Sequence, residues 1–180
     1  MQVINLWGGP GCGKSTTAAG LFSLMKMRGH RVELVTEYAK DLTYEQDWEM
    51  LNKQELMYPE QIKRQHRLEG QVDFAITDSP LPLNMIYARD ELKNDPQFNK
   101  LVIDGFNSFD NFNIMLMRVK PYNYYGRKET SDKALDIDHE CIHMLERLDT
   151  TYHWVRGDED SPVIIYNMLF GNYKISLTTH

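Results

Sequence analysis

The chain has 180 residues, 42% of them hydrophobic and 26% charged, which suits one compact domain over residues 1–180 and leaves little room for an added module. The net charge of -6 argues against a broadly basic surface for nucleic acid, although a local basic patch remains compatible with it. No apolar run approaches the roughly 20 residues of a membrane span, and the first motif starts too close to Met1 for a signal peptide, so we expect a cytoplasmic protein with Cys12 and Cys141 as free thiols.

The first predicted element is a buried strand over residues 2–7, and a glycine-rich run over residues 8–15 follows it directly. This run matches the pattern G-x-x-x-x-G-K-[ST], whose backbone N–H groups turn inward around the phosphates of a nucleoside triphosphate. We expect Lys14 to reach the β- and γ-phosphates and Ser15 to ligate the Mg²⁺ that bridges them. The predicted nucleotide-binding residues are Gly9, Pro10, Gly11, Cys12, Gly13, Lys14, Ser15 and Thr16. A glycine-rich turn without a ligand is the alternative, and the strand before the loop and the helix after it disfavour that interpretation.

Four further strands are predicted along the chain, separated by helical patterns. They cover residues 31–36, 72–77, 112–117 and 152–155. The alternation of strands and helices predicts a three-layer α/β fold of the P-loop NTPase type, with a five-stranded parallel sheet. Ligands in such sheets bind beyond the carboxyl ends of the strands, so the residues that follow each strand are the candidates for a site.

Two carboxylates follow predicted strands. Asp78 comes directly after the third strand, where P-loop enzymes place an acid that holds Mg²⁺, and a helix N-cap is its alternative role. Glu37 follows the second strand, where a carboxylate can accept the proton of an attacking hydroxyl or hydrogen-bond a sugar or base. The alternative for Glu37 is a cap of the helix expected to start near residue 38. Both side chains should converge on the phosphate-loop edge of the sheet.

A segment rich in cations, aromatic residues and turn formers follows the fourth strand and predicts a lid over about residues 118–133. A mobile arginine there would place positive charge on the transferring phosphoryl group and help to exclude water. Arg127 is the first candidate for that contact, with Arg118 and Lys120 next. The tyrosines of the segment offer flat faces on which a base can stack, and they are Tyr122, Tyr124 and Tyr125. A solvated surface loop is the alternative.

Two further clusters favour ordinary surface roles. The basic run over residues 63–67 can touch a phosphate backbone, but on a predicted helix such a run is usually a solvated face. His139 and His143 stand four residues apart with Cys141, Asp136 and Asp138 nearby, a spacing compatible with a metal on one helical face. The sequence supplies no convincing remaining ligands, so we do not predict a metal site there.

Four stretches together resemble a family of small bacteriophage P-loop proteins. They are residues 7–17, 35–41, 76–81 and 120–127. The family is similar to thymidylate-kinase-like enzymes, includes phage kinases that phosphorylate 5-hydroxymethyluracil bases in DNA on the way to hypermodified thymidines, and more distantly resembles the ribosylnicotinamide kinase domain. The phosphate loop is generic, whereas the combination of the other three stretches is more specific to the phage group.

The resemblance implies a Mg²⁺-dependent kinase that transfers the γ-phosphoryl group of ATP to the hydroxymethyl group of 5-hydroxymethyluracil in phage DNA, in the host cytoplasm. Lys14 and Ser15 would hold phosphate and metal, Asp78 would organise the metal, Glu37 would activate or position the hydroxyl, and Arg127 would close over the transferring group. A target base would have to flip out of the duplex. The alternatives are a kinase of a free nucleoside or nucleotide, such as ribosylnicotinamide or a deoxynucleoside monophosphate, and an ATPase or switch that acts on a protein partner.

Overall fold

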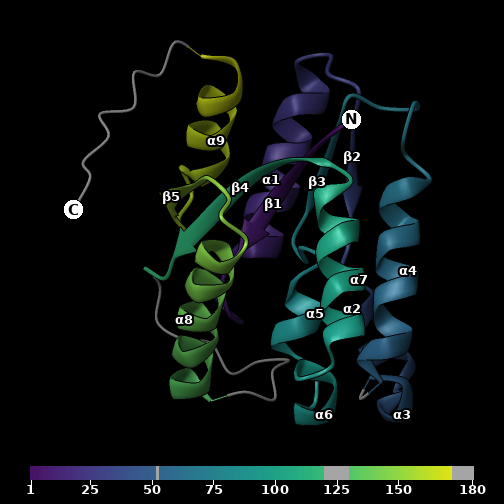
Figure 1. The fold of residues 1–180 in the computed structure, drawn as a ribbon. Coiled ribbons are helices and arrows are strands. Elements are labelled where there is room, and N and C mark those ends of the chain that lie inside the picture. Colours follow the sequence, from purple (N-terminus) through teal and green to yellow (C-terminus); the bar gives the residue numbers. More distant parts are fainter. Residues whose placement is uncertain (52, 120–129, 172–180) are drawn as a thin grey trace.

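The fold is built on a parallel sheet of five strands in the order β2-β3-β1-β4-β5. The computed structural model describes residues 1–51, 53–119 and 130–171 (Figure 1). The strands are β1 (Gln2–Trp7), β2 (Val32–Val35), β3 (Phe74–Thr77), β4 (Asp110–Met117) and β5 (Tyr152–Arg156). Every neighbouring pair is parallel. This confirms the predicted fold class, with strand ends that shift by a few residues from the predicted ones.

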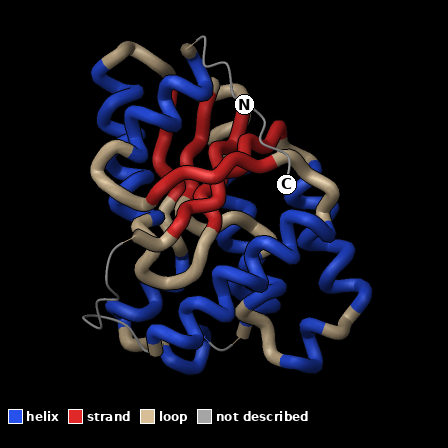
Figure 2. The backbone as a smooth tube through the Cα atoms, turned by 90° about the vertical axis from the view of Figure 1, so that its left-hand side faces the viewer, coloured by secondary structure: helices blue, strands red, loops and turns tan. Residues whose placement is uncertain are grey.

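Helices lie on both sides of the sheet, which gives the three layers visible in Figure 2. The helices are α1 (Lys14–Met27), α2 (Tyr38–Glu45), α3 (Trp48–Leu51), α4 (Gln54–His66), α5 (Leu83–Ile86), α6 (Asp90–Lys93), α7 (Pro96–Asn107), α8 (Ser131–Arg147) and α9 (Ser161–Phe170). Among the described residues, none of these helices combines the length and the apolar character needed to cross a membrane.

Two hydrophobic clusters fill the space between the layers. On one face, α1 and α9 pack against Ile4 and Leu6 of β1 through side chains such as Leu21 and Ile165. On the other face, α7 and α8 pack against Val3 and Trp7 of the same strand. The alternation of side chains along β1 therefore divides between two cores, as expected for a strand covered on both faces.

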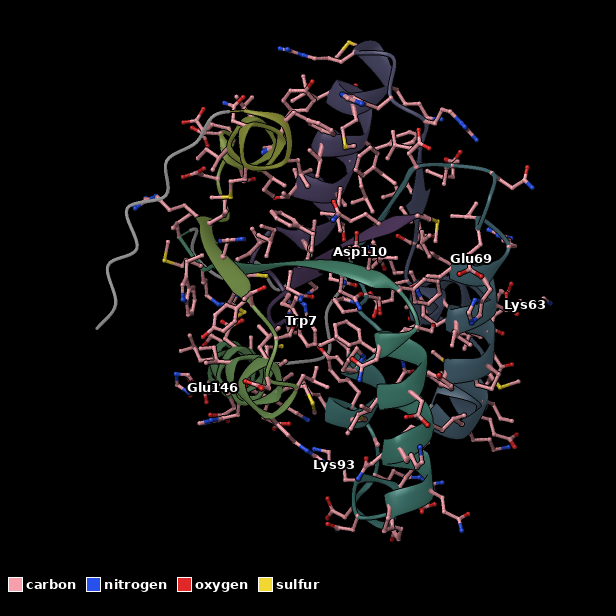
Figure 3. All side chains as sticks on the ribbon, turned by 45° about the horizontal axis from the view of Figure 1, so that its top comes forward. Trp7, Lys63, Glu69, Lys93, Asp110 and Glu146 are labelled. Atoms are coloured by element: carbon pink, nitrogen blue, oxygen red, sulfur yellow. The ribbon has the colours of Figure 1, made fainter. Side chains whose placement is uncertain are left out.

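Trp7 fixes the end of β1 just before the glycine-rich run. Its side chain is fully buried, its indole Nε1 donates to Asn113 Oδ1 at 3.1 Å, and its ring meets the edge of Phe106 with 6.1 Å between centroids. Figure 3 shows Trp7 within the body of the molecule between the sheet and the helices of that face. A large ring held in this way anchors the strand end from which the phosphate loop begins.

All five strands end at the same edge of the sheet because they are parallel. The loops that leave this edge carry Gly8, Glu37, Asp78, Arg118 and Gly157. The predicted lid overlaps the start of α8, because that helix begins at Ser131 and Thr130 caps it by accepting from the Lys133 amide at 3.3 Å. Residues 120–129 of the predicted lid lie outside the described residues.

Candidate active site

The glycine-rich run forms a loop between β1 and α1, as predicted. Gly11 and Gly13 have φ angles of 84° and 106°, in the left-handed region where a side chain is strained. Gly13 immediately precedes α1, so the loop's backbone passes directly into the amino-terminal end of a helix of 14 residues. That helix end adds partial positive charge to the loop and suits it to bind phosphate.

Lys14 lies across this loop. Its ammonium donates to the carbonyl oxygens of Gly8 at 2.5 Å and Gly9 at 3.0 Å. Burial acts to lower the pKa of Lys14, yet its pKa is raised overall because Cys12, Glu37, Cys141 and Asp78 favour the charged form, in that order. The lysine is therefore a fixed cation within the loop, in the position where a P-loop holds its phosphates.

Ser15 and Asp78 meet beside Lys14. The Ser15 hydroxyl donates to Asp78 Oδ2 at 2.6 Å, and the Asp78 side chain is almost completely buried. The second carboxylate oxygen, Oδ1, is buried without a hydrogen-bond partner among the described residues. A buried carboxylate oxygen without a donor calls for a cation or a bound water, and a hydroxyl with a carboxylate supplies the hard oxygen ligands that Mg²⁺ prefers. The pair thus fits the predicted magnesium site.

The alternative role of Asp78 as a helix cap does not fit its surroundings. The next helix, α5, begins only at Leu83 and has Pro82 at its cap position. The Asp78 carboxylate instead accepts from Ser15 and from the ammonium of Lys40. Its place at the end of β3 therefore directs it towards the phosphate loop.

Glu37 stands at the cap position of α2, half-buried, next to the end of β2. Its side chain makes no capping hydrogen bond to the first amides of α2, within the part of the chain that the structure describes. Its charge is close enough to Lys14 to raise the pKa of that ammonium. Glu37 therefore lies after β2 at the edge of the sheet that carries the phosphate loop, and its role as base or positioning group stays a prediction.

Asp138 of α8 holds the phosphate loop and was not predicted in that role. Its Oδ1 accepts from the Gly9 amide at 2.5 Å, and its Oδ2 accepts from the Arg118 guanidinium at 2.9 and 3.0 Å. Arg118 also donates to the Pro10 carbonyl at 2.8 Å. The sequence carries a signal only for the burial of Asp138, which lies on the same face of α8 as the buried Ile137 and Cys141.

Its ion pair with Asp138 gives Arg118 a structural role that the sequence did not predict. The sequence places it at the start of a mobile lid, whereas in the structure it is largely buried and paired with Asp138. It tethers the end of β4 to the phosphate loop and to α8. A contact of Arg118 with substrate stays a prediction. The remaining lid candidates lie outside the described residues, and they are Lys120, Tyr122, Tyr124, Tyr125 and Arg127.

A second unpredicted support comes from Gly157, which follows β5. Its amide donates to the Met117 carbonyl at 2.9 Å, and a Cβ at this position would overlap the carbonyl oxygen of Cys12. Glycine is therefore required for close packing of the loop after β5 on the phosphate loop.

Both cysteines are free and buried, and desolvation raises the pKa of Cys141 to about 12.

Helix α4 holds the start of α2. Gln61 Oε1 accepts from the Tyr38 amide at 3.0 Å. Arg64 donates to Asp41 Oδ2 at 2.6 Å, and its guanidinium lies over the Tyr38 ring at 4.8 Å from the centroid. Arg64 thus departs from the solvated face expected for residues 63–67, whereas Lys63 follows that expectation and lies on the outer side of α4 (Figure 3).

Lys40, in the first turn of α2, is the remaining charged group of the site that sequence reasoning missed. Its ammonium donates to Ser15 Oγ at 2.5 Å and to Asp78 Oδ2 at 2.9 Å. It lies three residues after Glu37, so both side chains belong to one turn. The spacing of three residues could have predicted Lys40 as a site residue, because side chains three positions apart lie on the same face of a helix.

Comparisons with known proteins agree with this architecture. The fold is similar to that of thymidylate kinase from Ehrlichia chaffeensis, with a TM-score of 0.60 and 14% sequence identity over 93% of this chain and 98% of that chain. No curated protein matches the sequence. The similarity to a solved structure at this identity concerns the fold alone, and it agrees with the expected α/β fold of the P-loop NTPase type. The family profile described as an AAA domain matches residues 3–161, and the chain therefore belongs to that AAA domain family.

Proposed function

We propose that this protein is an ATP- and Mg²⁺-dependent kinase that transfers the γ-phosphoryl group to a hydroxyl. The observation that carries the proposal is the contact between the exposed Ser15 hydroxyl and the buried Asp78 carboxylate beside Lys14, with one oxygen of that carboxylate left without a donor among the described residues. A phosphate loop alone is common to many NTPases, but Glu37 adds a second carboxylate near Lys14, which can accept a proton from a hydroxyl or orient it.

Each residue of the site has a separate role in the proposed phosphoryl transfer. The acceptor oxygen forms a bond to the γ-phosphorus while the bond to the β–γ bridging oxygen breaks, so that the products are the phosphorylated acceptor and ADP. Lys14 and the amides of the phosphate loop stabilise charge on the phosphate oxygens. Glu37 takes the hydroxyl proton or orients the hydroxyl. Mg²⁺ held by Ser15 and Asp78 would neutralise charge on the β- and γ-phosphates.

The acceptor that the sequence resemblance favours is 5-hydroxymethyluracil in DNA. Its hydroxymethyl group is a primary hydroxyl, and the predicted lid supplies cations and aromatic rings for a flipped base. Transfer to DNA would fall steeply with salt, because each phosphate contact releases counterions.

A free nucleoside or nucleotide is the second candidate acceptor, and a specific observation favours it. The basic run on α4 pairs with carboxylates of the chain itself: Lys63 with Glu60, Arg64 with Asp41 and Glu60, and His66 with Glu69. Together with the net charge of -6, these pairs reduce what α4 can offer a DNA backbone.

The test is a transfer assay with γ-labelled ATP and Mg²⁺. The acceptors are DNA with 5-hydroxymethyluracil, unmodified DNA, ribosylnicotinamide and deoxynucleoside monophosphates, each at low and at high salt. Label on the modified DNA alone, with strong salt dependence, supports the DNA base as acceptor. Label on a small acceptor, insensitive to salt, moves the assignment to the second candidate. Release of free phosphate alone contradicts the kinase proposal and favours an ATPase.

Two lysine variants control the assay. Lys14→Ala removes the cation within the phosphate loop and should abolish transfer to every acceptor. Lys26→Ala changes a lysine in the last turn of the same helix, where the side chain pairs with Glu33 at 3.6 Å, and should leave transfer unchanged. Full turnover by Lys14→Ala would refute the assignment of the phosphate loop.

A further inference from the structure

The ammonium of Lys40 occupies the same pair of oxygens that the proposed magnesium site uses. It is 2.5 Å from Ser15 Oγ and 2.9 Å from Asp78 Oδ2, while Ser15 and Asp78 are themselves 2.6 Å apart. The three atoms therefore form a closed group of one cation and two oxygen ligands. Next to it lies Asp78 Oδ1, which is buried and without a donor among the described residues.

A magnesium ion that used Ser15 Oγ and Asp78 Oδ2 would have to displace the ammonium from them. Magnesium needs its oxygen ligands at about 2.0–2.1 Å in octahedral geometry, which leaves little room for a second cation on the same two oxygens. Two cations that close, sharing a single carboxylate, would repel each other strongly. The buried Asp78 charge nevertheless needs a partner whether or not a metal is bound, and Lys40 supplies one.

The exchange needs only a side-chain movement. The start of α2 is held by α4, through the hydrogen bond from the Tyr38 amide to Gln61 and the pair between Arg64 and Asp41. The Lys40 side chain is 43% exposed, whereas that of Asp78 is 5% exposed. The lysine therefore has a solvent-facing route by which it can leave a carboxylate that stays in place.

We propose that Lys40 and the metal are alternative cations at Ser15 and Asp78. The Lys40 ammonium holds the pair in the metal-free protein and is displaced when the metal–nucleotide complex binds. The displaced ammonium stays on the first turn of α2, which follows Glu37 directly. This inference rests on the proposed function, because it needs the metal–nucleotide complex to bind.

The first test measures metal affinity directly. Mn²⁺ replaces Mg²⁺, and free Mn²⁺ is followed by electron paramagnetic resonance at saturating ADP, so that no turnover is needed. Lys40→Met should bind Mn²⁺ at least about threefold more tightly than the unmodified chain, because the competing cation no longer reduces the fraction of competent sites. Lys40→Arg keeps a competing cation and should stay close to the unmodified chain.

The control is Lys100→Met, which removes a lysine from an ion pair on α7. Lys100 lies 2.5 Å from Asp104, outside the site, and the substitution should leave Mn²⁺ affinity unchanged. Mn²⁺ binding by Lys40→Met that is equal to or weaker than that of the unmodified chain overturns the exchange, while the magnesium site itself stands. Failure of the unmodified chain to bind Mn²⁺ with ADP overturns the proposed function and the exchange together.

Thermal unfolding gives a second, independent readout. In EDTA, Lys40→Met should unfold at a temperature about 3 °C or more below that of the unmodified chain, because Asp78 loses its counter-charge. Adding Mg²⁺ and ADP should narrow that gap, since the metal then supplies the charge. A gap that stays the same in both conditions means that Lys40 is an ordinary ion-pair partner and overturns the exchange.

Discussion

The phosphate loop is held by contacts to its backbone atoms, whereas the first turn of α2, the proposed acceptor side, is held by long side chains of α4. Asp138 of α8 accepts from the Gly9 amide, and Arg118 after β4 donates to the Pro10 carbonyl. Gly157 after β5 packs closely against the Cys12 carbonyl. On the acceptor side, Glu37 and Lys40 project from a single turn that Gln61 and Arg64 support from α4.

This difference in how the two sides are held separates triphosphate binding, which is general to the fold, from the choice of acceptor, which is particular to this chain. A loop fixed by backbone contacts to three neighbouring segments is preorganised for any triphosphate, and few substitutions leave it intact. A turn fixed by side chains can be refitted to another acceptor by changing a few residues of α2 and α4. We therefore expect variants of the first side to lose ATP binding and stability, and variants of the second to lose transfer with ATP binding retained.

Glu37→Gln provides the largest expected effect. If Glu37 is the base, kcat should fall by about 10²–10⁴-fold, because the amide cannot take the proton, while ATP affinity stays unchanged. The measurement is single-turnover transfer together with equilibrium ATP binding. Glu45→Gln, at an exposed position in the same helix, is the matched control. Unchanged kinetics in Glu37→Gln would leave Glu37 as the residue at the cap position of α2, without a chemical role.

Asp138→Asn tests the phosphate side. The Asp138 and Arg118 side chains are 12% and 14% exposed, so the substitution removes a carboxylate charge that a largely buried guanidinium contacts. We expect a loss of about 3 kcal/mol in the free energy of unfolding, which corresponds to a fall of about 6–12 °C in Tm for a domain of this size. Weaker ATP binding should accompany the loss, since Gly9 is held by the same carboxylate.

The control for this variant is Asp136→Asn, which changes an exposed carboxylate two residues earlier in α8. It should unfold and bind ATP as the unmodified chain does, because surface substitutions of this kind change stability little. Equal Tm values for Asp138→Asn and Asp136→Asn would show that the phosphate side is not held as the geometry indicates.

The sequence alone was sufficient for the sheet, the phosphate loop and the places of Glu37 and Asp78. These features depend on local patterns: apolar runs of strand length, a glycine-rich motif, and carboxylates that follow strands. In a parallel sheet, the position of a residue after its strand already places it at the ligand-binding edge. The structure therefore agrees with the sequence wherever position along one element determines position in space.

The contacts between distant elements were not predictable in the same way. Asp138 and Gly9 are 129 positions apart, and no local pattern reveals which loop a buried acid on α8 will hold. Arg118 looked like part of a lid because its neighbours are typical of a loop, but its partner lies on the following helix. Gly157 carries no signal of its own, since only the backbone packed against it makes glycine necessary.

Gly157→Ala tests the packing of the phosphate loop by adding one methyl group, without any change of charge. The new methyl group would overlap the Cys12 carbonyl, so the phosphate loop or the loop after β5 must shift. We expect a loss of about 1–3 kcal/mol in stability from overpacking, and weaker ATP binding measured by titration. Gly70→Ala is the control, because Gly70 has a φ of 73° with open space around it and its strain of about 1 kcal/mol should leave ATP affinity unchanged.

Arg64→Met is the smallest expected change and the one that tests the acceptor side most cleanly. Arg64 supports α2 through Asp41, the Thr36 carbonyl and the Tyr38 ring, but it contacts no residue of the phosphate loop in the described structure. We expect stability to fall by about 1 kcal/mol. The acceptor KM should rise about threefold to tenfold because the turn that bears Glu37 and Lys40 is less well positioned.

ATP affinity separates the two interpretations of Arg64. If the acceptor side is an independent unit built from side chains, Arg64→Met binds ATP normally and Lys63→Met, which changes the outward-facing neighbour on α4, matches the unmodified chain in both measurements. If Arg64→Met weakens ATP binding as much as acceptor binding, α2 and the phosphate loop move together. The site would then be one rigid unit, in which substitutions that change the acceptor preference would also weaken ATP binding.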